Sequence, residues 1–377
     1  MKKKICIVTG SRAEYGLQKN LINLINRDKT IKLFLIVSGM HLSKEHGNTI
    51  KQIQKDKIRI HKKIKIVKKK SDVLNEMSLL IKEISKELKK IKPDIVLLVG
   101  DRYEIFATAI AAYYLKIKIA HFHGGETTIG SLDEGARHSI SKLSNLHFVA
   151  NQSFKEKLIR MGEDPINIFA YGGLGVDNIL STKFLNKKKI ENFLGTKLAK
   201  YNFLVTYHPE KENIKKQIKF IKSSIGFFLK MKNTKVLITA PNSDTNNADL
   251  IKVLKNEVNK NRKILYYYPS LGNQLYYSLI KFIDCVIGNS SSGICEVPSL
   301  KKGTINVGDR QDGRPRSKSV IDIKYEFSQF KAALKKIMST KFKQNLNKNI
   351  NPYGNNKSSK LIFKKIKQFL KDNKKNK

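Results

Sequence analysis

The chain has 377 residues, 40% of them hydrophobic, which suits two domains with real cores better than one. Its 74 Lys and Arg residues exceed its 31 Asp and Glu residues by 43, a balance that alone suggests a polyanionic partner. The lysines are spread over nearly every block of ten without stacking aromatic residues, which argues against nucleic-acid binding. No run approaches the roughly 18 apolar residues of a membrane span, and the three cysteines form no CxxC pair. We therefore expect a soluble, cytoplasmic protein without a disulfide framework.

Short apolar runs alternate with helix-length segments, which predicts buried parallel strands in β–α–β units. In the first half we expect strands within 4–10, 32–39, 94–101, 118–125, 146–151 and 167–173. In the second half we expect them within 202–209, 235–242, 263–269, 284–293 and 304–309. The glycine-rich segment 171–180 lies between the two series and is expected to be a hinge. The predicted fold is α/β, with two Rossmann-like domains facing each other across a cleft.

Polar residues gather directly after the predicted strands. In chain order they are Ser11 and Arg12, Asp101 and Arg102, His121 to Glu126, His208, Asn242, Asn289 to Ser292, and Asp309 and Arg310. Open parallel sheets bind ligands at the carboxyl ends of their strands. We therefore expect the two sheets to gather these residues in one cleft.

The stretch VIGNSSSGICEVPSL, residues 286–300, predicts an anion site. A strand ends at Gly288 and a helix begins near Ser291, where free N–H groups and serine hydroxyls can bind a pyrophosphate. A helix cap needs only one serine, so the run of serines favours the phosphate interpretation over capping alone. Glu296 lies about one turn further on, and either accepts hydrogen bonds from ribose hydroxyls or is an exposed helix glutamate.

Arginines on two further loops are candidates for phosphate binding. Arg12 lies in GSRAEYG, residues 10–16, a strand-to-helix turn that matches neither the Walker pattern nor GxGxxG. Its guanidinium either pairs with a phosphate or forms a surface salt bridge. The glycine loop GDRQDGRPR is typical of a phosphate clamp, a lid or a plain basic loop, and carries Arg310, Arg314 and Arg316.

Titratable groups are concentrated in AHFHGGETTIGSLDEGARH, residues 120–138. His121 and His123 are two residues apart at a strand end, a spacing that can chelate zinc. A structural zinc site needs four ligands, and no cysteine is nearby, so we expect no metal here.

The carboxylates of the same stretch have two interpretations. SLDE at 131–134 matches a helix capping box. Asp133 faces Arg137 and Glu134 faces His138, both at i,i+4, so one or both acidic residues can be structural. Asp133 and Glu134 cannot both be caps, however. Carboxylates remain for acid/base work, and the candidates are Asp101, Glu126, Asp133 and Glu134.

Eight motifs together resemble the hydrolysing UDP-N-acetylglucosamine 2-epimerases of sialic-acid and legionaminic-acid biosynthesis. In chain order they are GSRAEYG, SGMHLSKEHG, GDRYE, HFHGGETT, LDEGARHSISKLSNLHF, HPE, APNSD and GNSSSGICEVPSLKKGTINVGDRQDGR. The resemblance implies the two-domain fold of the GT-B glycosyltransferases. It implies an N-terminal domain at 1–175 with the sugar and acid/base residues, a nucleotide-binding domain at 176–355, and a last helix at 356–377 that crosses back.

The resemblance also implies roles for individual residues. It assigns nucleotide or substrate contacts to Arg12, Ala13, Arg102, His208, Asn242, Ser290, Ser291, Glu296 and Arg310, to which we add Arg314 of the same loop. It assigns acid/base roles to Asp101 and Asp133, and our further catalytic candidates are His123, Glu126, Glu134 and His208.

This chain departs from the family pattern at one catalytic position. Several members have a glutamate as the third residue of H-x-E-G-G-E, where this chain has His123. Either His123 or Glu126 then carries the proton, or the change marks a modified sugar substrate. The spacing to LDE is also one residue longer, which leaves Asp133 and Glu134 as alternatives.

The implied chemistry explains the residue types. The C2 proton of the sugar is not acidic, and the chain lacks the GxGxxG of a nicotinamide site, so no cofactor is expected. Expulsion of the nucleoside diphosphate, loss of the C2 proton and addition of water require an anion site and two proton-handling groups. A histidine such as His123 suits proton transfer near neutral pH.

We expect a hydrolase of the O-glycosyl bond of a nucleotide sugar that releases N-acetylmannosamine or a close analogue. Rivals are the same reaction on N,N′-diacetylbacillosamine, a non-hydrolysing epimerase, a GT-B glycosyltransferase and a basic nucleic-acid-binding protein. The nucleotide, uridine or guanosine, stays open, and so does the sugar. A homodimer is compatible with the resemblance, and no nucleic acid or membrane partner is expected.

Overall fold

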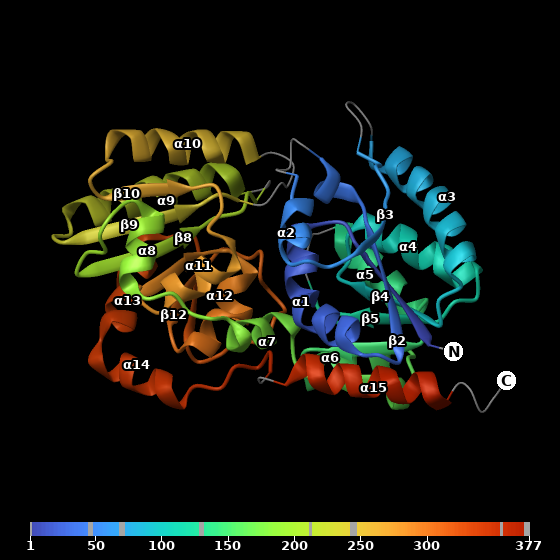
Figure 1. Ribbon diagram of the computed structural model, residues 1–377. Coiled ribbons are helices and arrows are strands. Elements are labelled where there is room, and N and C mark those ends of the chain that lie inside the picture. Colours follow the sequence, from blue (N-terminus) through green and yellow to red (C-terminus); the bar gives the residue numbers. More distant parts are fainter. Residues whose placement is uncertain are drawn as a thin grey trace. The chain divides into compact units, whose positions relative to one another are not determined.

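The computed structural model describes residues 2–43, 48–67, 72–127, 132–210, 213–241, 247–354 and 357–372. The chain divides into two compact units, each an α/β layer structure (Figure 1). Unit 1 consists of Met1–Leu180 together with Tyr353–Lys377, and unit 2 is Ser181–Pro352. The sequence predicts domain boundaries at 175 and 355. After Pro352 the chain returns from unit 2 to unit 1.

Unit 1 contains a parallel sheet in the order β3-β2-β1-β4-β5-β6-β7. Its strands are β1 (Lys3–Thr9), β2 (Ile31–Val37), β3 (Ile60–Lys63), β4 (Ile95–Val99), β5 (Ile119–Phe122), β6 (Leu146–Val149) and β7 (Ile168–Ala170). Its helices are α1 (Arg12–Arg27), α2 (Ile50–Lys55), α3 (Val73–Ile91), α4 (Tyr103–Tyr114), α5 (Leu132–Lys142), α6 (Gln152–Arg160), α7 (Leu174–Ser181) and α15 (Ser358–Asp372). The strand order reverses between β1 and β4, so the loops that follow these strands diverge and leave room for a ligand.

The period-2 alternation of each strand divides the core of unit 1 into two layers. Ile5 and Ile7 of β1 pack in one cluster, and Cys6 and Val8 pack in the other. The first cluster includes side chains from both α1 and α15, which pack against each other (Figure 1). The second includes buried side chains of α3 and α4. Helices therefore cover both faces of this sheet, as its continuous apolar strands require.

Unit 2 contains a second parallel sheet in the order β10-β9-β8-β11-β12-β13. Its strands are β8 (Tyr201–Thr206), β9 (Thr234–Thr239), β10 (Leu265–Tyr268), β11 (Cys285–Gly288), β12 (Gly303–Val307) and β13 (Val320–Ile323). Its helices are α8 (Lys187–Leu194), α9 (Ile214–Lys230), α10 (Asn247–Lys260), α11 (Gly272–Ile280), α12 (Ser291–Cys295), α13 (Phe327–Met338) and α14 (Thr340–Asn345). An aromatic cluster anchors α9 and α13 to the sheet, with the rings of Phe203 and Phe228 4.6 Å apart between centroids. The reversal in strand order falls between β8 and β11.

The prediction of two Rossmann-like α/β domains is confirmed. Two strands were missed, β3 and β13, and both lie at sheet edges. Three of the four residues of β3 are exposed, so the apolar run that marks a buried strand is absent there. Among the described residues, no helix is both long and apolar enough to cross a membrane.

Gly288, the last residue of β11, is a position that only glycine can occupy. Its φ is +135°, and a Cβ there would overlap the backbone carbonyl of Thr206 on β8. We expect Gly288→Ala to lower the free energy of unfolding by about 3 kcal/mol or more, because strain and a backbone collision add. Thermal unfolding followed by circular dichroism measures the loss.

The matched control is Gly226→Ala in α9, where a Cβ would meet nothing within 4 Å. That change should raise stability by up to about 1 kcal/mol, because alanine is the better helix former. Equal stability of the two variants would contradict the close-approach argument.

Candidate active site

A single guanidinium joins the polar residues at the carboxyl ends of β4 and β5. Arg137 of α5 is buried and forms an ion pair with Asp101, which follows β4. Its Nη1 donates to the backbone carbonyl of Glu126 at 2.8 Å and to Glu134 Oε2 at 3.0 Å. The sequence pattern predicted Arg137 only as an i,i+4 partner of Asp133 and not as a site residue. The structure makes it the residue that gathers three of the predicted site positions.

His123 and Glu126 form a hydrogen-bonded pair beside this guanidinium. His123 Nδ1 lies 2.7 Å from Glu126 Oε1, and the Glu126 side chain is buried. With the Nδ1–H donated to the carboxylate, Nε2 is the atom that can accept a proton. Nε2 is buried and has no hydrogen-bond partner among the described residues. His123 also has a left-handed backbone, φ +67°, which turns the chain sharply after β5.

Glu134 and Asp133, adjacent in the first turn of α5, have different surroundings. Glu134 Oε1 lies 3.0 Å from His138 Nε2 and 3.2 Å from Lys157 Nζ, in addition to its pair with Arg137. The predicted i,i+4 contact with His138 is thus confirmed. Asp133 is exposed. Ser131, the predicted cap, lies outside the described residues.

His121, the other histidine of the predicted strand end, serves the fold. His121 is fully buried, with Nε2 donating to the carbonyl of Gly100 at 2.8 Å and Nδ1 3.0 Å from Ser141 Oγ. Burial lowers the pKa of His121 to about 3, so it is neutral and holds the loop after β4 in place. No group of three or more His, Cys, Asp or Glu side chains in the described ranges is arranged to hold a metal ion.

The predicted nucleotide contacts of unit 1 lie where α1 and α4 begin. Arg12 and Ala13 are exposed in the first turn of α1, which Ser11 caps. Arg102 precedes α4, and its Nε donates to the buried Glu104 at 3.2 Å. All three therefore follow β1 or β4, the strands between which the sheet order reverses.

In unit 2 the loops after β8 and β11 are joined by Asn289, which is fully buried. Its side chain accepts from the backbone N–H of His208 at 2.6 Å and donates to the carbonyl of His208 at 2.8 Å. The backbone carbonyl of Asn289 accepts hydrogen bonds from the side chains of Gln311 at 2.9 Å and Arg310 at 3.4 Å. Burial, and then the charge of Arg310, lower the pKa of the His208 side chain to about 3, which keeps that ring neutral.

Glu296 is held in a network of hydroxyl groups after α12. Ser292 Oγ donates to Glu296 Oε2 at 2.6 Å, and Tyr277 OH donates to Oε1 at 3.1 Å. Burial raises the pKa of Glu296. The alternative of an exposed helix glutamate is therefore wrong.

The remaining predicted contacts of unit 2 can be placed more briefly. Ser290 is the N-cap residue of α12, and Ser291 is its first residue. Arg314 Nη1 lies 3.7 Å from Cys295 Sγ. Asn242 lies outside the described residues.

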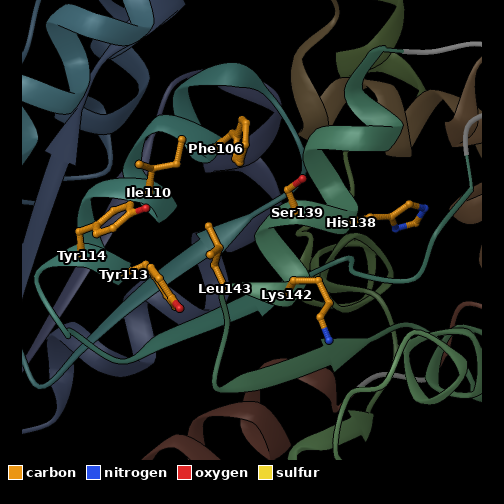
Figure 2. Close-up of a pocket in the computed structure, with 8 residues that line it drawn as sticks. All are labelled: Phe106, Ile110, Tyr113, Tyr114, His138, Ser139, Lys142 and Leu143. Atoms are coloured by element: carbon orange, nitrogen blue, oxygen red, sulfur yellow. The ribbon is translucent and has the colours of Figure 1, made fainter.

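A groove with a volume of about 540 Å³ runs between α4 and the end of α5 (Figure 2). Its lining is mainly apolar and includes Phe106, Ile110, Tyr113 and Leu143. Apart from His138, which contacts Glu134, its described lining has no direct contact with the acid/base cluster recorded above. We therefore place the candidate active site at the strand ends rather than in this groove.

The profile of the family described as UDP-N-acetylglucosamine 2-epimerase matches residues 23–367. The chain belongs to this family. It is 41% identical to a Campylobacter jejuni protein named GDP/UDP-N,N′-diacetylbacillosamine 2-epimerase (hydrolyzing), over 91% of this chain and 90% of that protein. It is 38% identical to polysialic acid biosynthesis protein P7 of Escherichia coli, over 98% of this chain and 95% of that protein.

Solved epimerase structures share the fold of this epimerase-family chain. UDP-GlcNAc 2-epimerase of Methanocaldococcus jannaschii, in complex with UDP-GlcNAc and UDP, matches with a TM-score of 0.80 and 21% identity, over 97% of this chain and 99% of that one. The enzyme from Neisseria meningitidis bound to UDP-GlcNAc matches with a TM-score of 0.76 and 19% identity, over 97% of this chain and 100% of that one. At these identities the likeness shows the fold alone.

Proposed function

We propose that this protein is a hydrolysing 2-epimerase of nucleotide-activated N-acetylated sugars. It converts the nucleotide sugar and water to the free 2-epimer and a nucleoside diphosphate, and so supplies nonulosonic-acid synthesis of the sialic or legionaminic type. The observation that carries the proposal is the cluster in which Arg137 contacts Asp101, Glu134 and the backbone of Glu126, beside the His123–Glu126 pair.

The first half of the reaction is an elimination. The C1–O bond breaks and its electron pair leaves with the diphosphate, while a base takes the C2 proton and the C2–H electrons form the C1–C2 double bond. We assign the base to the His123–Glu126 pair, in which Glu126 orients the ring and Nε2 accepts the proton. The ring and its carboxylate together do the work of the family glutamate.

The second half is an addition on the opposite face. Water adds to C1 and gives up a proton, and an acid returns a proton to C2 to set the new configuration. We assign this acid to Asp101, whose position is held by Arg137. Glu134 already pairs with Arg137, His138 and Lys157, so we assign it to positioning Arg137. Asp133 is exposed, and we assign it to carrying protons to and from solvent.

Departure of the diphosphate needs positive charge and hydrogen-bond donors. In unit 1 we assign these contacts to Arg12, Ala13 and Arg102, at the start of α1 and α4. In unit 2 we assign them to His208, Asn242, Ser290, Ser291, Arg310 and Arg314, and we assign Glu296 to the ribose hydroxyls. Asn289 supports this assignment because it fixes the loops that carry His208 and Arg310.

Two sugars are candidates. Two relatives named for N,N′-diacetylbacillosamine are 41% and 34% identical, which favours that substrate. A relative from Neisseria meningitidis named UDP-N-acetylglucosamine 2-epimerase is 29% identical over 86% of this chain, which favours UDP-N-acetylglucosamine. A panel of UDP- and GDP-sugars, read by proton NMR for a free sugar product, separates the candidates and the two nucleotides.

Reaction in D₂O should place deuterium at C2 of the free sugar. The C2 proton leaves in the elimination and is replaced from solvent in the addition, so we expect nearly complete incorporation, measured by proton NMR and mass spectrometry. A product that keeps its C2 protium would contradict the elimination.

The same incubation tests the rival functions. A glycosyltransferase would need an acceptor before it released the nucleotide, and a non-hydrolysing epimerase would return a nucleotide-bound epimer. A nucleic-acid-binding protein would bind DNA or RNA with an affinity that falls as salt rises, and would show no turnover of the nucleotide sugar. A homodimer and a cytoplasmic location stay predictions, to be measured by sedimentation and by fractionation.

A further inference from the structure

Two carboxylates share one guanidinium beneath the start of α1. The Glu14 side chain is buried, and Glu104 at the start of α4 is 0% exposed. Arg102 Nε lies 3.2 Å from Glu104 Oε2 and 3.7 Å from Glu14 Oε1. With all three groups ionised, this buried cluster carries one uncompensated negative charge, which is costly away from water.

The same carboxylates hold the backbone after three strands. Gly10 N–H donates to Glu14 Oε2 at 2.7 Å, and Ser11 Oγ donates to Oε1 at 3.0 Å. Glu104 packs against the backbone of Gly10 and Gly39, where a Cβ would collide with its side chain. Any change in the charge of the cluster therefore acts on the loops after β1, β2 and β4 together.

Among the described residues, few charged or titratable groups face Glu14. From α4 they are Arg102 and Glu104, and the neighbouring Tyr103 donates its hydroxyl to Glu76 of α3. From the 3₁₀ turn at Gly39–Leu42 comes His41, whose pKa burial lowers to about 4, so that it is neutral at physiological pH. Burial, and then the charge of Glu104, raise the pKa of Glu14 to about 8.

We propose that the cluster of Glu14, Glu104 and Arg102 shares one proton, which Glu14 carries, and that both glutamates are positioning residues for Arg102. With the proton bound, the cluster is neutral. The Arg102 side chain is one-third exposed, and its guanidinium can present its remaining N–H groups to a diphosphate. Loss of the proton draws Arg102 inward and leaves a negative charge beneath an anion site. The anion-binding half of this inference rests on the proposed function, and the shared proton does not.

The shared proton is tested without any ligand, by thermal unfolding between pH 5 and pH 9. The folded-state pKa of Glu14 lies above its unfolded value, so its stabilising effect is full below pH ~4.5 and is lost as pH rises to about 8. We expect the stability of the wild-type protein relative to Glu14→Gln to fall through this window, with Glu104→Gln as a second variant. Glu83→Gln removes an exposed carboxylate that pairs with Lys86, and should leave the pH dependence in this window unchanged.

The positioning role is tested by calorimetric binding of UDP and of GDP at pH 6.5 and pH 9. Between pH 6.5 and pH 9 we expect the affinity of the wild-type protein for the nucleotide to weaken by roughly tenfold. This is the effect of a unit negative charge about 10 Å from the anion at an effective dielectric constant of about 20. Glu14→Gln should lose most of this weakening, and in turnover the pH effect should fall on KM rather than kcat.

The outcomes separate the two claims. A pH-independent stability difference between the wild-type protein and Glu14→Gln overturns the shared proton. Parallel weakening of nucleotide binding in both proteins overturns the positioning of Arg102. A third outcome is that the pH-dependent stability difference is present but neither UDP nor GDP binds at any pH. That result overturns the positioning of Arg102 and counts against the proposed function, whereas the shared proton is retained.

Discussion

Asp101→Asn should lower kcat by roughly 10²–10⁴, the usual contribution of one acid/base group, with little change in KM. Asparagine keeps the shape of the side chain but cannot deliver a proton to C2. The fold should survive, because Arg137 keeps its bonds to Glu134 and to the carbonyl of Glu126. Steady-state release of nucleoside diphosphate measures the loss, and calorimetric UDP binding checks that the nucleotide contacts remain.

Asp94→Asn is the matched control for this variant. Asp94 lies just before the same strand, β4, and pairs with Lys3 at 3.1 Å, so it is also an aspartate paired with a cation. It lies at the opposite end of the strand from Asp101, and its replacement should leave kcat near the wild-type value. A normal kcat in Asp101→Asn would remove Asp101 from the mechanism.

His123→Ala should reduce kcat by a similar factor, roughly 10²–10⁴, because it removes the atom assigned as the base. The partly buried cavity that it leaves should admit imidazole, so added imidazole should restore part of the turnover. Glu126→Gln keeps the imidazole ring but loses the carboxylate that orients it, so its defect should be smaller and should not respond to imidazole. Rates measured across an imidazole series distinguish the two variants.

His61→Ala serves as the control for nonspecific effects of imidazole. His61 is on the edge strand β3 and lies 3.6 Å from Glu87, remote from the predicted chemistry. Its turnover should be normal and unaffected by imidazole. If Glu126→Gln is the more damaged variant and His123→Ala is nearly active, the glutamate is the proton carrier and our assignment within the pair is wrong. Loss of activity on chelation, with recovery on adding zinc, would instead favour the metal interpretation.

The strand ends and their polar residues could be predicted because they depend on local signals. Buried parallel strands appear as continuous apolar runs, and the residue that follows each run must lie at the carboxyl edge of the sheet. This reasoning places Asp101 and His123 directly after strands, where the structure has them, behind β4 and β5. That these two strands pair with each other was not predicted. The reasoning fails at the edge strands β3 and β13, because each of them buries too little of its surface to show the pattern.

The links between these residues were harder to predict. Arg137 reaches Asp101 across 36 positions of the sequence, and no periodicity connects an arginine in the middle of a helix to an aspartate after a strand. The sequence left His123 and Glu126 as alternatives, whereas their hydrogen bond makes them one unit. The shared guanidinium of Glu14 and Glu104 likewise joins two helix starts that are remote in sequence.

The return of the chain to unit 1 has a consequence for how the protein is made. Ile362, Ile366 and Leu370 of α15 complete the core that Leu21 and Ile25 of α1 begin. During synthesis, unit 2 is complete once Pro352 has emerged from the ribosome, whereas unit 1 waits for its last helix. At ordinary translation rates the part of α1 that α15 covers stays exposed for roughly 10–40 s after Leu180 is made. The domain that starts first therefore finishes last.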